Sequence, residues 1–159
     1  MKWVECNRPT YVGNCLEIGS LYINGGVSQF FNDAESYFGI DMVKGRNVDI
    51  VTNAHDLHKY FHENSTDTII WLESAEHDPA FWKTAEQVKR ILKPNGFLLF
   101  SAPTIDFPYH YSPDLWRFTS EGIAEICKLC GTTIIKQEIL KDTSGHSGII
   151  AICKKEKYE

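Results

Sequence analysis

The segment NCLEIGSLYINGG (residues 14–26) joins a short apolar run to a loop rich in glycine. The run Asn14–Ile18 has the length of a buried strand, and Gly19 follows it directly. Glycine lets the backbone turn sharply and lets its amide groups approach a ligand closely. The segment therefore predicts a strand that ends in a ligand-binding turn, followed by a short helical piece over Val27–Asn32.

Six further segments have the composition of strands. Two of them contain the continuously apolar runs TIIWL and FLLF, as strands covered on both faces do. The predicted strands are Tyr37–Asp41, Val48–Thr52, Asp67–Leu72, Phe97–Ser101, Thr132–Leu140 and Gly148–Lys154.

Helical segments alternate with these strands. The clearest begins at Asp78-Pro79, where Asp caps free amides and Pro fits the first turn, and Lys93–Gly96 ends it. A second helix is expected over Ser120–Cys130, stopped by Gly131, and a shorter piece over Asp56–Glu63. This alternation predicts an open, mostly parallel α/β sheet with helices on both faces and ligands at the carboxyl ends of its strands.

The composition sets limits on function. The 159 residues are 43% hydrophobic and 23% charged, which is typical of one globular domain. A net charge of -5 makes nucleic acid an unexpected partner. Because no run approaches the ~20 apolar residues of a membrane span, we expect a cytoplasmic protein with no membrane partner. The odd number of cysteines, five, fits reduced thiols in that compartment.

An acidic residue follows the glycine loop at a spacing typical of nucleotide binding. Asp41 ends the second predicted strand about 20 positions after Gly19, where a carboxylate can accept hydrogen bonds from both ribose hydroxyls. The G-x-G-x-x-G pattern of dinucleotide enzymes is absent, which disfavours a nicotinamide-dependent dehydrogenase.

These features together resemble the class I S-adenosylmethionine-dependent methyltransferases, specifically short single-domain members of the methyltransferase domain 11 kind. The glycine loop resembles the first motif of that family. Four more segments follow in the family's order: YFGID (37–41), VTNAHDL (51–57), WLESAEHD (71–78) and ILKPNGFLLFSAP (91–103). The resemblance implies a seven-stranded Rossmann-like sheet with an antiparallel last strand, one domain over residues 1–159, and a short N-terminal extension over residues 1–13.

The resemblance also implies a cofactor, S-adenosyl-L-methionine, and residues that hold it; the product is S-adenosyl-L-homocysteine. Asp41 would bind the ribose hydroxyls, Met42 would lie against the adenine, and Asn53 would accept from the adenine amino group. The remaining cofactor residues that it implies are Glu17, Gly19, Ser20, Asn24, Gly25, Ala54, His55 and Glu73.

Methyl transfer to a hydroxyl or amine needs alignment and removal of a proton. His77 and His110 are the candidate proton acceptors, although His77 can equally be a packing residue beside the helix start. The long loop DFPYHYSPDLWRFT (106–119) offers substrate contacts, namely Tyr109, Tyr111, Trp116 and Arg117. Packing of Trp116 and Arg117 against the sheet is an equally good reading. The long loop resembles a stretch found in a subgroup of these methyltransferases that is often associated with sugar or cell-surface biosynthesis.

Several alternatives remain open at this point. The acceptor is an oxygen or nitrogen of an unidentified small or carrier-linked metabolite, and a protein of another class, a catalytically silent cofactor-binding scaffold, is the main rival. The short N-terminal extension predicts an open site that a large substrate or the second subunit of a homodimer completes. We expect no metal site, because the spacing of Cys127 and Cys130 fits helix packing and that of His58 and His62 fits a solvated helix face.

Overall fold

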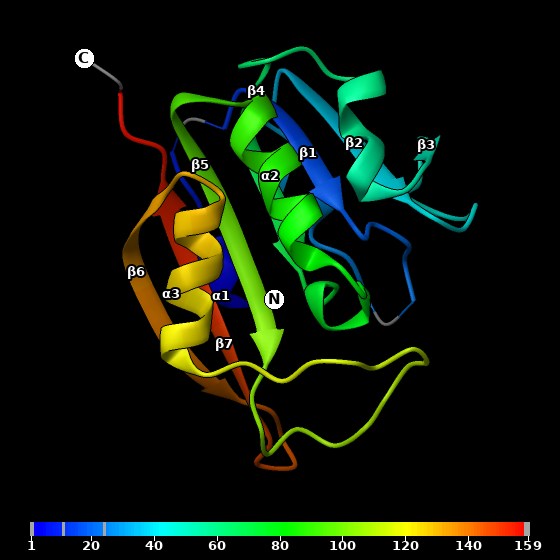
Figure 1. Ribbon diagram of the computed structural model, residues 1–159, viewed down its shortest axis with the longest axis vertical. Helices are drawn as coiled ribbons and strands as arrows, with labels where there is room; N and C mark the ends of the chain where they lie inside the picture. Colours follow the sequence, from blue (N-terminus) through cyan, green and yellow to red (C-terminus); the bar gives the residue numbers. More distant parts are fainter. Residues whose placement is uncertain (1, 11, 24, 158–159) are drawn as a thin grey trace.

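A seven-stranded sheet organises the molecule (Figure 1). The structure is a computed structural model and describes residues 2–10, 12–23 and 25–157. Along the sheet the strand order is β3-β2-β1-β4-β5-β7-β6. The strands are β1 (Asn14–Ile18), β2 (Ser36–Asp41), β3 (Ile50–Val51), β4 (Thr66–Leu72), β5 (Leu92–Pro103), β6 (Thr133–Lys141) and β7 (Ser147–Lys154).

The strand directions confirm the predicted topology. β1 pairs in parallel with β2 and β4, and β4 pairs in parallel with β5. β7 is antiparallel to both of its neighbours, β5 and β6. The chain leaves β1 toward β2 on one side, and β4 lies on the other, so a crevice opens at the carboxyl end of β1 where ligands of α/β sheets bind.

Helices cover both faces of the sheet, as expected. α2 (Phe81–Ile91), α3 (Ser120–Leu129) and the 3-10 helix η2 (Ala54–Lys59) pack on one face, where Val88, Ile126 and Leu57 are buried. On the other face lie α1 (Lys2–Asn7) and the 3-10 helix η1 (Ser28–Phe31), through Val4 and Phe31. Because strand side chains alternate, the continuously apolar runs feed both clusters.

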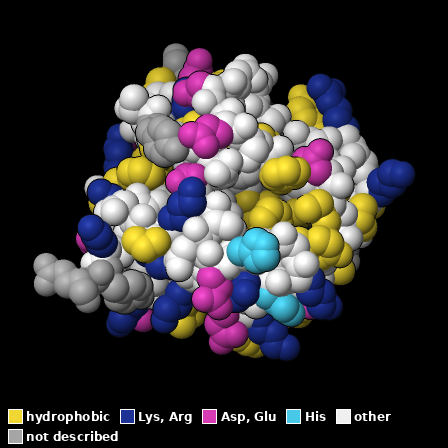
Figure 2. Space-filling view, turned by 90° about the horizontal axis from the view of Figure 1, so that it is seen from above, with side chains coloured by type: hydrophobic (Ala, Val, Ile, Leu, Met, Phe, Trp, Pro, Cys, Tyr) yellow, Lys and Arg dark blue, Asp and Glu magenta, His cyan; other side chains and the backbone are white. Residues whose placement is uncertain are grey.

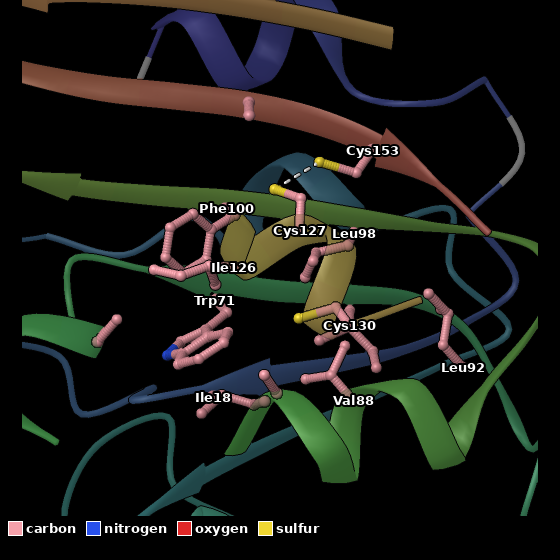
Figure 3. Close-up of a cluster of buried hydrophobic side chains, with 14 of the residues drawn as sticks. Ile18, Trp71, Val88, Leu92, Leu98, Phe100, Ile126, Cys127, Cys130 and Cys153 are labelled. Atoms are coloured by element: carbon pink, nitrogen blue, oxygen red, sulfur yellow. Dashed lines mark hydrogen bonds between the residues drawn. The ribbon is translucent and has the colours of Figure 1, made fainter. Parts of the chain in front are cut away.

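The larger core cluster contains three of the cysteines (Figure 3). Cys127 of α3, Cys130 directly after α3, and Cys153 of β7 are buried there beside Trp71 and Phe100. Burial raises the pKa of the Cys130 thiol well above its usual value, which makes a thiolate ligand or nucleophile unfavourable. The packing interpretation of the C-x-x-C spacing fits this environment.

Several element boundaries differ from those predicted. The first predicted helical pieces are 3-10 helices, and β3 contains only Ile50 and Val51. Helix α2 starts at Phe81 rather than at Asp78-Pro79, and a third 3-10 helix, η3 (Ala75–His77), precedes Asp78. The Asp78 carboxylate still accepts hydrogen bonds from Ala80 N and the Thr84 hydroxyl, so it supports the helix start from outside the helix.

The helix also ends earlier than expected, and the C-terminal end is more ordered. α2 stops at Ile91, and the turn 93–96 is part of β5. The polar C-terminal segment, which composition alone suggests is frayed, contributes Lys154 to β7 and a buried Lys155. The Lys155 ammonium donates to the carbonyls of Lys89 and Leu92 at 2.7 and 2.6 Å, which satisfies free carbonyls at the end of α2.

The residues before β1 form a helix that the sequence did not predict. α1 lies on the sheet face through Val4. Among the described residues, none of the helices is both long and apolar enough to cross a membrane. Figure 2 views the edge at which the parallel strands begin, and there basic, acidic and hydrophobic side chains are interspersed.

Candidate functional site

A pocket of about 240 Å³ opens at the carboxyl ends of β1, β2 and β4. We call it the carboxyl-edge pocket. It collects the ends of strands that are far apart in the sequence, together with the start of η2 and the loop before α2. Its lining residues are Ile18, Gly19, Ile40, Asp41, Met42, Thr52, Asn53, Ala54, Ser74, His77, Asp78, Pro79 and Thr84.

The loops after β1 and β4 approach each other closely at this pocket. Gly19 has a φ of 73°, and a Cβ there would lie 2.6 Å from Ser74 Cβ. Both the backbone conformation and the contact therefore require glycine. The amides of Gly19 and Ser20 donate to Ile40 O at 3.0 Å, which fixes the turn against β2.

Asp41 occupies the end of β2, at the side of the pocket. Its Oδ1 accepts from Val43 N at 2.9 Å and its Oδ2 from Leu21 N at 3.3 Å. These bonds hold two loops together, which is the turn-capping role of an acid at this position. A carboxylate has about four acceptor sites, so it retains capacity for two ligand hydroxyls.

Asn53 and His55 shape the opposite side of the pocket. Asn53 caps η2, because its Oδ1 accepts from His55 N at 2.8 Å. The His55 Nε2 lies 3.0 Å from Asp78 Oδ1, and this contact ties η2 to the start of α2. His55 is thus a bracing residue behind the lining.

Other residues implied as cofactor ligands lie outside the lining. Glu17 is buried and accepts from Tyr37 Oη and Asn47 Nδ2 at 2.6 and 2.7 Å. Burial raises the pKa of Glu17, while these two hydrogen bonds act in the opposite direction. Ser20 donates to Asn47 O, so these residues build the loop under the pocket.

The remaining members of the implied cofactor set differ in placement. Met42 lines the pocket and is 70% exposed, so its side chain is free to cover a ligand. Gly25 is outside the lining, and Asn24 lies outside the described residues. Glu73 follows β4 and accepts from the Ser101 hydroxyl at 2.6 Å, away from the lining.

A second group of polar side chains adjoins the pocket through His77. We call Glu76, His77 and His110 the His–Glu cluster. The Glu76 Oε1 lies 3.8 Å from His77 Nε2 and 3.5 Å from His110 Nε2, and the two imidazole rings are 4.9 Å apart. The structure therefore brings together the two histidines that the sequence selected, one from η3 and one from the loop after β5.

Burial governs the charges in the His–Glu cluster. Glu76 is fully buried, and this burial raises its pKa to about 8, with the nearby charges of Glu73 and Asp114 adding to the shift. Loss of hydration lowers the pKa of His110. At neutral pH the His110 ring is therefore mostly neutral and carries a free nitrogen lone pair.

The loop between β5 and α3, whose path Figure 1 shows, brings His110 next to His77 of η3. Leu115 N donates to Glu76 O at 2.8 Å, and Trp116 Nε1 donates to Asp78 O at 2.8 Å. Arg117 fastens the loop internally, with charged hydrogen bonds to both carboxylate oxygens of Asp114 and further bonds to the carbonyls of Phe107 and Pro108. Trp116 and Arg117 thus have structural partners.

Asp114 is the functional candidate that the sequence analysis missed. Its side chain is fully buried, and the guanidinium of Arg117 holds its pKa well below the usual range. Its Oδ2 lies 3.2 Å from His110 Nδ1. The only signal in the sequence is the spacing of Asp114 from His110 and Arg117. Tyr109 and Tyr111 of the same loop are 68% and 52% exposed.

The family comparison agrees with this architecture. Residues 25–100 match the sequence profile of a family described as "Methyltransferase domain". The fold is that of the class I S-adenosylmethionine-dependent methyltransferases, which agrees with this match. A search of curated proteins finds no sequence that matches the chain.

Solved structures share the fold at low sequence identity. A Burkholderia thailandensis 1,6-didemethyltoxoflavin-N1-methyltransferase, bound to 1,6-didemethyltoxoflavin and S-adenosylhomocysteine, is 16% identical with a TM-score of 0.74, over 92% of this chain and 72% of that one. A complex of the Haloferax volcanii Trm112 methyltransferase activator with a methyltransferase is 15% identical with a TM-score of 0.76, and the match covers 99% of this chain and 89% of that one. The [4+2]-cyclase SpnF is 14% identical with a TM-score of 0.70, and the match covers 93% of this chain and 76% of that one. The methyltransferase domain thus shares its fold with proteins of more than one described activity.

Proposed function

We propose that this methyltransferase domain binds S-adenosylmethionine in the carboxyl-edge pocket and transfers its methyl group to an oxygen or nitrogen acceptor. The observation that carries the proposal is the convergence of Gly19, Asp41 and Asn53 on one pocket beside β1. The Burkholderia thailandensis enzyme, which shares the fold, holds S-adenosylhomocysteine, the demethylated form of that cofactor.

The pocket offers each part of the cofactor a suitable neighbour. In this proposal the ribose hydroxyls donate hydrogen bonds to the free acceptor sites of Asp41. The adenine ring contacts Met42 and Ala54, and the side-chain oxygen of Asn53 accepts a hydrogen bond from the adenine amino group. The methionine part follows the turn at Gly19 and Ser20. We also assign Glu17, Gly25, His55 and Glu73 to the cofactor site, together with Asn24.

The His–Glu cluster is the side of the site where the acceptor is expected. In the transfer, the acceptor atom forms a bond to the methyl carbon, the carbon–sulfur bond breaks, and its electron pair stays on sulfur. The acceptor also loses a proton, which His77 or His110 can take up as a general base. Tyr109, Tyr111, Trp116 and Arg117 belong to the loop that borders this side, so we propose a small or carrier-linked metabolite, such as a sugar, as substrate.

A scaffold or an enzyme of another class is the second candidate. The cyclase SpnF has this fold and a different described activity, so the fold alone does not fix the reaction. This alternative keeps the pocket and predicts binding of the cofactor with no methylated product in any acceptor screen.

Calorimetric titration tests the cofactor assignment. Purified protein is titrated with S-adenosylmethionine, with S-adenosylhomocysteine and with NAD as a control. We expect saturable binding of the first two and none of NAD. Failure of both sulfur compounds to bind a folded sample, shown by circular dichroism, would overturn the proposal.

Asp41→Ala tests the ribose contact within that assignment. Loss of a charged acceptor weakens binding by about 1–3 kcal/mol, or about 5- to 150-fold. Glu86→Ala, which removes an exposed acid on α2, is the matched control and keeps wild-type affinity. Equal affinities of the two variants would contradict the role of Asp41.

We also propose a cytoplasmic location, since all five cysteines are free thiols in the structure, as a reducing compartment maintains them. A homodimer remains our proposal for how the exposed side of the site is completed. Sedimentation of the protein at increasing concentration checks it, and a constant monomer mass would contradict it.

A further inference from the structure

Glu76 is a buried acid without a hydrogen-bond donor. Its side chain has no exposed surface, and neither carboxylate oxygen accepts a hydrogen bond from a described residue. Such a group is expensive to bury, and folded proteins almost always give it a partner. The two nearest nitrogens, on His77 and His110, lie 3.8 and 3.5 Å from Oε1, which is outside good hydrogen-bond geometry.

Both histidines place their other ring nitrogen, Nδ1, beside an oxygen atom of the loop between β5 and α3. The Nδ1 of His77 lies 2.5 Å from Pro113 O, which can only accept a hydrogen bond, so Nδ1 is protonated and donates. The Nδ1 of His110 lies 3.2 Å from the carboxylate of Asp114 without hydrogen-bond geometry, and the negative charge beside it favours a proton on the same ring nitrogen. In the neutral rings both Nε2 atoms then carry a lone pair directed at Glu76. A proton on Glu76 can be shared with only one of these lone pairs, whereas a cation can bind all three side chains at once.

This pattern is the one that proteins use around metal ions. Metal-ligating histidines usually donate their second ring nitrogen to a carbonyl or a carboxylate, which fixes the tautomer. The donor atoms of Glu76, His77 and His110 lie within 4.8 Å of one another. Ligands about 2.1 Å from a tetrahedral ion are about 3.4 Å apart, so small rotations of the two partly exposed rings complete the set.

We propose that Glu76, His77 and His110 form a binding site for one divalent transition-metal ion, departing from the metal-free site expected from the sequence. Two imidazoles and one carboxylate suit Zn²⁺, Mn²⁺, Fe²⁺ or Co²⁺, whereas Mg²⁺ prefers oxygen ligands and retained water. His77 and His110 are about a quarter exposed on their side chains, so the remaining coordination positions face solvent and the acceptor.

The ion would give the His–Glu cluster a definite role, and this part rests on the proposed methyl transfer. A hydroxyl bound to the ion is more acidic, as water bound to Zn²⁺ is. The acceptor oxygen releases its proton to solvent, forms the bond to the methyl carbon, and leaves the sulfur with the electron pair. In this arrangement the two histidines hold the ion instead of taking the proton, and the substrate class narrows to molecules with a hydroxyl group.

Direct metal titration tests the site without any acceptor. The full chain, free of affinity tags and stripped with a chelator, is titrated with Zn²⁺ and Co²⁺, with Mg²⁺ as a control. We expect one equivalent of Zn²⁺ to bind, a visible absorption band with Co²⁺, and no competition from millimolar Mg²⁺. Glu76→Gln, His77→Ala and His110→Ala should each weaken Zn²⁺ binding about a hundredfold or more.

His58→Ala and His62→Ala are matched controls, because both residues are exposed and lie outside the cluster. Zn²⁺ binding that persists in the cluster variants, or that is lost in the controls, would overturn the proposal, as would the absence of binding in the wild type. Calorimetry with S-adenosylmethionine on the same samples separates this result from the proposed function: a sample that binds the cofactor and no metal refutes the metal site alone.

Discussion

The carboxyl-edge pocket and the His–Glu cluster share one edge of the sheet but differ in how their acids are satisfied. In the pocket, both carboxylate oxygens of Asp41 accept hydrogen bonds from backbone amides. Behind the pocket, Glu17 accepts hydrogen bonds from Tyr37 and Asn47. In the cluster, Glu76 is just as deeply buried and accepts nothing from a described residue. The first region is therefore organised before a ligand arrives, and the second is completed by one.

The largest expected effect comes from disturbing the organised region at its tightest point. Gly19→Ala introduces a Cβ 2.6 Å from Ser74 Cβ at a positive φ, so we expect about 2–4 kcal/mol of destabilisation and loss of cofactor binding. Gly145→Ala is the matched control, since its φ is 88° but nothing lies within 4 Å. It should cost only about 1 kcal/mol.

Denaturant unfolding measures both free energies, and calorimetry measures affinity for S-adenosylmethionine. If the two variants lose equal stability, the contact between the loops after β1 and β4 does not constrain the pocket.

A paired substitution compares the two buried acids directly. Glu17→Gln replaces the one carboxylate oxygen that accepts from both Tyr37 and Asn47 with a neutral amide oxygen, which weakens both hydrogen bonds and should destabilise the protein by about 1–2 kcal/mol. Glu76→Gln removes a buried acid that has no donor, so in chelator-treated protein it should be neutral or stabilising. Urea unfolding at one pH gives both values, and a reversed order would show that Glu76 is the better satisfied acid.

The pH dependence of stability in the wild type and in Glu17→Gln tests the direction in which the pKa of Glu17 is shifted. The folded-state pKa of Glu17 is raised above its ordinary value of 4.5, so its contribution to stability is fully present below pH 4.5 and declines as pH rises through the folded pKa. The stability of the wild type relative to Glu17→Gln should therefore be greater at pH 4 than at pH 8. An increase toward pH 8 would contradict the assigned direction.

The smallest effect on global stability is expected at the loop that carries His110. Arg117→Lys loses the paired hydrogen bonds to Asp114, because an ammonium cannot reproduce the guanidinium geometry. Because loops can open without global unfolding, we expect a loss of less than about 1 kcal/mol in the free energy of global unfolding but faster proteolysis between β5 and α3. Cofactor affinity should stay within about twofold, and weaker metal binding would accompany the displaced His110.

Lys128→Arg is the control, because it exchanges the same two residue types at an exposed position of α3 and should leave the rate of proteolysis unchanged. An unchanged cleavage rate in Arg117→Lys would show that Trp116 and the backbone contacts hold the loop without the guanidinium.

The strands were the most predictable part of the fold, because their signal is local. The run Asn14–Ile18 is apolar, short and ended by glycine, and β1 has those bounds. The start of α2 was misplaced because Asp78 accepts from Ala80, Thr84 and His55 together, and that competition is set by η2 packing nearby. Lys155 likewise looked like a solvated end, but three-dimensional packing places it at the end of α2.

The candidate site divides in the same way. Gly19, Asp41 and Asn53 follow strands, so their sequence positions predict that they meet at one edge. Asp114 and the unpartnered state of Glu76 could not be predicted, because they depend on how a long irregular loop folds back over η3.

The sequence by itself determined the α/β class, the order of the motifs and the edge of the sheet at which the polar residues gather, because hydrophobic periodicity and glycine turns act over a few residues. Only the tertiary structure decided which of those residues face the pocket, which brace it, and that two histidines and a buried acid converge. Those outcomes depend on contacts between segments distant in the chain, whose burial and hydrogen bonding are fixed only when the whole domain packs.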